Sequence, residues 1–271
     1  MRASTLEAVL RRERAIVIAA LGLVALCAWA DLAWLSDGMA TGGMDMTGSG
    51  IIPAGRRLMM PATSPWPPVE FASVFVMWVV MMIGMMVPSA TPMILVHARA
   101  ARQSAAQGKP LAATAWFAGG YLLAWTTFSF GATLAQWGLE RASLLTPVKA
   151  GSGHVFSGTV LIAAGLYQWT PLKAACLSQC QSPIAFILRH GGLRNTATSS
   201  LVFGLRHGSY CVGCCWALML LLFVLGVMNL LWIAALAILV MLEKVLPFGR
   251  AVARLAGLLF VALGAWMLQP L

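Results

Sequence analysis

His207 to Asn229 reads HGSYCVGCCWALMLLLFVLGVMN, and this stretch sets three of the six cysteines at the start of a long apolar run. The apolar run predicts a membrane-spanning helix over residues 211–228. A second motif, CLSQC, lies upstream at Cys176 to Cys180, within a polar connection expected over residues 171–210. We interpret the rest of the chain as a scaffold that brings these two cysteine motifs together.

The composition is typical of a membrane protein. Hydrophobic residues make up 60% of the 271 residues and charged residues only 10%, whereas soluble domains carry about 25% charged residues. Backbone groups inside a bilayer must be hydrogen-bonded within each segment, so the apolar runs predict helices. We predict an all-α, polytopic transmembrane helical bundle that forms one domain over residues 1–271. Its seven spans are expected near 15–35, 69–96, 112–139, 153–170, 211–228, 230–246 and 251–268.

The formal net charge of +10 indicates membrane topology, because the basic residues lie between the apolar runs and form no patch for nucleic acid. With a cytoplasmic N-terminus, only Arg56, Arg57, Arg141 and Lys149 lie outside, which leaves 14 of the 18 lysines and arginines inside. This bias predicts an inner-membrane protein, surrounded by the lipid bilayer, with a periplasmic or extracellular C-terminus. Both cysteine motifs would face the cytoplasm, where reduced thiols favour metal ligation over disulfides.

Each cysteine motif has the spacing of residues on one helix face, because residues four apart, or seven and eight apart, lie on the same side. The ligand candidates are Cys176, Cys180, His207, Cys211, Cys214 and Cys215. Thiolates and imidazole suit Cu(I), Zn(II) or an iron–sulfur centre. Positive charge on Lys173, Arg206 and Lys244 would favour the thiolate form. Glu243 is expected to pair with Lys244 or with an arginine.

Two other interpretations of the cysteines stay open at this point. Cys211 and Cys214 have the C-x-x-C spacing of thiol–disulfide exchange proteins. Alternatively, the cysteines are small residues that pack between helices, or their metal only joins two helices of a structural subunit. Cys27 stands alone in the first span and is interpreted as an apolar filler.

Methionines form a second pattern, in the span expected over residues 69–96. Met77, Met81 and Met85 recur every four residues with Met86 beside them, so they share a helix face. They are interpreted either as core packing or as a metal path, and Pro88 and Pro92 should kink or end the helix. A loop over residues 36–68 is expected to be flexible or to collect soft metal through its own methionines: Met39, Met44, Met46, Met59 and Met60.

Several motifs between Val69 and Lys244 together resemble a known family. They are MMIGMMVPSATPM, GYLLAW, YQWTPLKAACLSQCQSP, GLRHGSYCVGCCWALM and MLEK. The set resembles a bacterial family described as predicted metal-binding integral membrane proteins. The resemblance implies metal binding by the cysteine and histidine candidates named above, and it implies no particular reaction.

We therefore expect a membrane protein that handles a soft metal, with Cu(I) favoured, by transport or by delivery to another membrane metalloprotein. The alternatives are a thiol redox protein using Cys211 and Cys214, and a structural subunit of a membrane complex. A non-enzymatic role is favoured. The sequence contains no G-x-x-x-x-G-K-[ST] loop, which argues against ATP-driven pumping by this chain.

Overall fold

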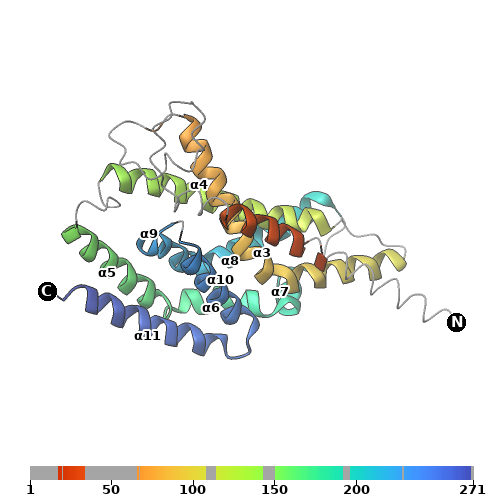
Figure 1. Cartoon of the computed structure of the whole chain (residues 1–271). Helices are drawn as coiled ribbons and strands as arrows, with labels where there is room; N and C mark the ends of the chain where they lie inside the picture. Colours follow the sequence, from red (N-terminus) through yellow and green to blue (C-terminus); the bar gives the residue numbers. More distant parts are fainter. Residues whose placement is uncertain are drawn as a thin grey trace.

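The computed structural model describes residues 18–19, 21–33, 66, 68–107, 114–142, 150–191, 196–227 and 229–269. The regular structure in these ranges is helical, and they contain no strand (Figure 1). The all-α class is therefore confirmed for this part of the chain. The methionine-rich stretch over residues 36–60 lies outside the described residues.

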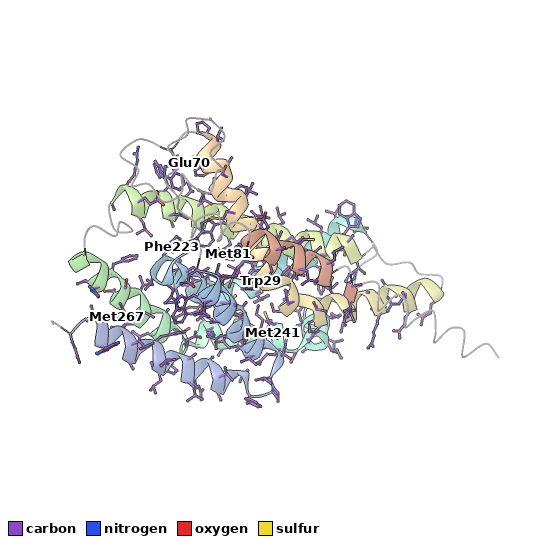
Figure 2. All side chains as sticks on the ribbon, in the orientation of Figure 1. Trp29, Glu70, Met81, Phe223, Met241 and Met267 are labelled. Carbon is purple, nitrogen blue, oxygen red and sulfur yellow. The ribbon has the colours of Figure 1, made fainter. Side chains whose placement is uncertain are left out.

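Helix α3 (Pro68–Ala106) carries the methionine face and continues past its expected end near Val96. Pro88 and Pro92 lie inside it, and the ribbon changes direction along its length (Figure 1), as prolines inside a helix cause. The Met face is buried, and Met81 lies in the crowded centre of the molecule (Figure 2).

Helices α4 (Thr114–Arg141) and α8 (Ala197–Leu220) pack with their backbones in close approach. A Cβ placed on Gly120 would overlap the Leu201 carbonyl oxygen, and one on Gly204 would overlap the Phe117 carbonyl oxygen. Small residues at helix interfaces allow this kind of approach in membrane proteins. Glycine is therefore required at both contacts.

Helix α8 differs most from the sequence prediction. It begins at Ala197, well before the expected start at Cys211, so the predicted polar connection ending at Tyr210 is wrong over its last part. The side chain of Thr196 caps the helix by accepting a hydrogen bond from the Ser199 backbone N–H. Polar residues in the first turns hide this start from a hydropathy pattern. The cysteines therefore lie in the second half of a long helix, not at its beginning.

The remaining part of the expected connection is also helical. It forms α6 (Pro171–Gln181) and α7 (Pro183–Arg189), each with proline at its first position, where the missing N–H has no intrahelical partner to lose. The Thr170 side chain accepts a hydrogen bond from the Lys173 backbone N–H at the start of α6. This helix packs along α8 and brings the first cysteine motif to the second.

The C-terminal part begins with a short α9 (Leu222–Leu225) that ends at Gly226, whose φ of +97° favours glycine. Helix α10 (Leu230–Val245) follows. Helix α11 (Gly249–Met267) lies beside α5 (Ala150–Tyr167), as the lower part of Figure 1 shows. Both helices use glycines at their contact.

Among the described residues, three helical segments are long and apolar enough to cross a membrane: Pro68–Ser104, Ala197–Leu225 and Gly249–Met267. Leu21–Ala33 and His154–Tyr167 are shorter apolar helices. Helix α11 also exposes large apolar side chains, among them Leu255 at 68% and Trp266 at 70%. The count of seven spans stays a prediction.

Candidate metal centre

The second cysteine motif lies on the buried side of α8. Cys211, Cys214 and Cys215 are all almost completely buried. The thiols of Cys214 and Cys215 donate hydrogen bonds to the Cys211 carbonyl oxygen at 3.1 and 3.0 Å. These three residues therefore form a compact thiol group in the helix interior.

The first cysteine motif reaches this group from α6. Cys176 lies against Gly213, because a Cβ on that glycine would lie only 2.9 Å from Cys176 Sγ. Burial raises the pKa of the Cys176 thiol above its ordinary value, and the nearby Cys214 raises it further. Hydrogen bonding with Cys211 and Cys214, together with burial, raises the pKa of the Cys180 thiol. Cysteines of both motifs therefore interact across the contact between α6 and α8.

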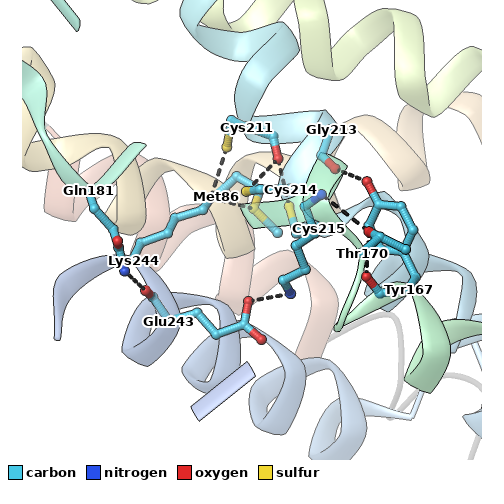
Figure 3. Close-up of polar contacts among 11 residues, drawn as sticks. Met86, Tyr167, Thr170, Gln181, Cys211, Gly213, Cys214, Cys215, Glu243 and Lys244 are labelled. Atoms are coloured by element: carbon cyan, nitrogen blue, oxygen red, sulfur yellow. Dashed lines mark hydrogen bonds and ion pairs between the residues drawn. The ribbon is translucent and has the colours of Figure 1, made fainter. Parts of the chain in front are cut away.

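A buried lysine completes this region from a third helix, α10. The Nζ atom of Lys244 lies 2.8 Å from Cys211 Sγ and 4.0 Å from Met86 Sδ (Figure 3). It also lies 3.1 Å from Ser89 Oγ. The hydroxyl of Tyr121 lies 3.1 Å from the same Cys211 sulfur. Four helices thus contribute polar or sulfur-containing groups around one thiol.

Glu243 has a different partner from the one expected. Its Oε2 accepts a hydrogen bond from Lys173 Nζ at 2.7 Å, and both side chains are 1% exposed. Gln181 Nε2 also donates to the Glu243 carbonyl oxygen at 2.8 Å (Figure 3). The expectation that Glu243 pairs with Lys244 or an arginine is therefore wrong, because Lys173 of α6 reaches the carboxylate while Lys244 turns to Cys211.

His207 lies one helical turn before Cys211 on α8 and is 3% exposed. Aromatic rings surround it, with the Phe186 ring centroid at 5.0 Å and the Tyr121 ring centroid at 6.0 Å. Its Nδ1 has no hydrogen-bond partner among the described residues. The imidazole is thus buried near the thiols with one nitrogen unsatisfied.

Within the described residues, no group of three His, Cys, Asp or Glu side chains stands ready to hold a metal ion. The hydrogen bonds explain why: Cys214 and Cys215 point to the Cys211 carbonyl, and Cys211 is in contact with Lys244. Rotation about the Cα–Cβ bond moves a thiol between staggered positions without moving the backbone. A metal centre here therefore requires the thiols to turn toward a common point.

A family model described as PpoB2 copper chaperone matches residues 75–267. The matched region runs from α3 to α11 and contains both cysteine motifs. The chain belongs to the PpoB2 copper chaperone family. Its function is therefore related to copper, in agreement with the metal-binding resemblance of its motifs. No curated protein and no solved structure matches the chain.

The matched region of this PpoB2-family chain also contains the methionine face of α3. The four methionines of the proposed path are almost completely buried: Met77, Met81, Met85 and Met86. Both core packing and a metal path require burial, so burial alone does not decide between them. Met86 reaches the thiol region, because its Sδ lies 4.0 Å from Lys244 Nζ.

Two polar groups in the thiol region were missing from the sequence prediction. Tyr121 and Ser89 contact Cys211 and Lys244, respectively. Arg206, which was expected to support the thiolates, is exposed instead. Tyr121 lies in the motif GYLLAW, and a tyrosine amid apolar residues is a signal that its hydroxyl needs a buried partner. Ser89 carried no comparable signal.

Proposed function

We propose that this copper chaperone is a membrane protein that binds Cu(I) between α6 and α8 and passes it to another membrane protein. The proposed ligands come from the thiols of both motifs, with the imidazole beside them: Cys176, Cys180, Cys211, Cys214, Cys215 and His207. The observation that supports this most is the contact between α6 and α8 at which Cys176 Sγ would lie 2.9 Å from a Cβ on Gly213, the residue before Cys214. This contact brings together two motifs that are about thirty residues apart in sequence.

Soft sulfur ligands and burial favour Cu(I) over harder metal ions. Thiolates also bind Zn(II), and the family match is what favours copper here. The ammonium of Lys244 at Cys211 Sγ favours a thiolate at Cys211 in the metal-free protein, because positive charge near a thiol favours its deprotonated form. His207 adds a nitrogen donor whose Nδ1 has no protein partner in the described part of the chain.

Delivery to a partner is favoured over driven transport. The sequence contains no phosphate-binding loop of the G-x-x-x-x-G-K-[ST] type to couple metal movement to ATP. A site made of thiols that turn between hydrogen bonds and a metal can give up its ion by ligand exchange with a second thiol-bearing protein. The proposed acceptor is therefore a membrane protein with soft ligands of its own.

Copper binding by the purified, reduced protein tests this proposal. Single serine variants of Cys176, Cys180, Cys211 and Cys214 should each weaken Cu(I) binding about tenfold or more in competition with a Cu(I) chelator. Cys27→Ser is the matched control, because Cys27 is exposed on the N-terminal helix, and its binding should equal that of the wild type. Equal copper binding by all the variants would refute the proposed site.

The same preparation distinguishes the redox alternative. A protein that binds no copper but forms a reversible disulfide from Cys211 would instead act in thiol exchange. Topology is tested separately in intact cells. The positive-inside bias predicts that an impermeant thiol reagent added outside leaves Cys180 unlabelled, and labelling of Cys180 from outside would reverse the proposed orientation.

A further inference from the structure

Lys244 is a buried, charged side chain beside Cys211, and copper binding by Cys211 does not explain why a lysine is buried there. Its side chain is 6% exposed and lies among Cys211, Ser89 and Met86, which belong to two other helices. A buried ammonium is strongly destabilising unless it is paired. Its closest recorded contact is the Cys211 sulfur at 2.8 Å. The structure therefore keeps a single positive charge beside the proposed copper ligand.

The position of the ammonium conflicts with a copper ion on the same side of Cys211. A metal–thiolate bond is about 2.3 Å long in zinc sites, and Lys244 Nζ lies 2.8 Å from the Cys211 sulfur and 4.0 Å from Met86 Sδ. An ion bound to Cys211 on the side of the ammonium would therefore overlap with it. The hydroxyl of Tyr121 already lies against the sulfur at 3.1 Å, which further limits the directions from which a metal can approach.

We propose that Lys244 occupies the Cu(I) position at Cys211 in the metal-free protein and leaves it when copper binds. This inference rests on the proposed function. Loading is then an exchange of one monovalent cation for another at the same sulfur, so the net charge at that sulfur is unchanged. Cys211 and Met86 become ligands of the ion, and Tyr121 remains beside the sulfur.

The displaced ammonium has a candidate acceptor in the preceding residue, Glu243. Glu243 Oε1 has no hydrogen-bond partner among the described residues, while its Oε2 is held by Lys173. A lysine that turns away from Cys211 can therefore stay paired with a carboxylate, which avoids a buried and uncompensated charge. Because the ammonium can return to Cys211, the protein contains its own competitor for the metal, which assists release to an acceptor.

The variants Lys244→Leu and Lys244→Arg distinguish an exchanging lysine from one that only balances charge. Leucine removes the charge and adds no thioether that could itself bind Cu(I). If Lys244 must leave the sulfur, its contact opposes copper binding, so Lys244→Leu should bind Cu(I) about tenfold more tightly than the wild type. If the lysine stays and balances the thiolate, its loss weakens binding. Lys244→Arg keeps the charge, and the proposal expects it to bind no more tightly than the wild type.

A structure of the wild-type protein loaded with Ag(I), a redox-inert substitute for Cu(I), decides the question even if Lys244→Leu does not fold. We expect Ag(I) on Cys211 Sγ and Lys244 Nζ beyond hydrogen-bond distance from that sulfur. Ag(I) on Cys211 with the lysine contact intact, or Lys244→Leu binding Cu(I) as the wild type does or more weakly, would overturn the exchange alone. Absence of metal from the cysteines altogether would overturn the exchange and the proposed function together.

Discussion

Gly213 lies directly against the thiol of Cys176, so that a Cβ on Gly213 would come within 2.9 Å of Cys176 Sγ. Real Cβ atoms do not approach a neighbour this closely, so a side chain at residue 213 must move the thiol. The contact lies on α8 between Cys211 and Cys214, where the two cysteine motifs meet. Glycine at this position therefore leaves room for a ligand candidate from another helix.

The Gly213→Ala variant is expected to damage the copper site more than the fold. The added methyl group meets the end of a side chain that can rotate, and not a backbone atom, so packing should lose about 1 kcal/mol or less. Copper affinity should fall about tenfold, because a ligand displaced by a fraction of an ångström binds poorly. Thermal unfolding and chelator competition measure the two effects. A variant that binds copper normally would show that Cys176 is not a ligand.

The contact between α4 and α8 predicts that alanine at Gly120, unlike alanine at Gly213, damages the fold. A Cβ there would overlap the Leu201 carbonyl oxygen and crowd the Leu205 backbone nitrogen, and backbone atoms inside a packed helix pair cannot move aside. Gly120→Ala should therefore destabilise the protein by about 3 kcal/mol or more. Gly119→Ala is the matched control, because nothing lies within 4 Å of a Cβ at Gly119. Thermal unfolding in detergent should separate the two variants, and equal stabilities would contradict the close helix packing.

A pH dependence is expected from Glu140, at the end of α4. Burial raises the pKa of this carboxyl group, although hydrogen bonds from Gln136 and Trp66 oppose the shift. The folded protein thus prefers the protonated form, whose stabilising effect is complete below the ordinary pKa of glutamate. This stabilising effect is lost as pH rises through the higher pKa of Glu140 in the folded state. The free energy of unfolding of the wild type should therefore fall between the ordinary pKa of glutamate and the raised pKa of Glu140.

The Glu140→Gln variant should lose that part of the pH dependence, because glutamine carries no titrating proton. Asp31→Asn serves as the control, since Asp31 is exposed. Unfolding temperatures measured between about pH 4 and pH 7 provide the comparison. An unchanged slope in Glu140→Gln would show that another group causes the dependence.

The helical class and most of the helix positions could be read from the sequence, because long apolar runs have few alternatives. The start of α8 could not. Its first turns contain Thr198, Ser199 and Ser200, and α8 packs on α4 through glycine contacts instead of large apolar side chains. A hydropathy pattern responds to apolar side chains and does not detect such backbone contacts. The helix was therefore expected to begin only where its apolar residues become continuous.

For the candidate site, residue spacing identified the cysteines but not their partners. The spacing of four ligand candidates predicts one helix, and the structure buries all four on α8: His207, Cys211, Cys214 and Cys215. Which lysine meets which acceptor depends on how α6 and α10 pack, and sequence spacing within one helix contains no information on that. Lys173 of α6 reaches Glu243, whereas Lys244, the residue next to Glu243 on α10, reaches Cys211.

The last prediction concerns the methionine path on α3, where Met81 and Met85 are 0% and 2% exposed. Replacing both by leucine keeps volume and apolarity nearly constant, so stability should fall by less than about 1.5 kcal/mol for each change. If the thioethers guide Cu(I) toward Met86 and Cys211, the double variant should load copper more slowly while its final copper content stays the same. Slower loading would then result from the loss of the two sulfur atoms, because volume and apolarity are nearly unchanged.

The control for this test is Met241→Leu, a methionine-to-leucine change at a side chain on α10 that is 41% exposed. It should load copper at the wild-type rate. Rates are measured by mixing reduced protein with a Cu(I) chelate and following loss of the chelate colour. A double variant that folds and loads copper at the wild-type rate would show that Met81 and Met85 only pack the core, because a path through their sulfur atoms cannot survive the loss of both.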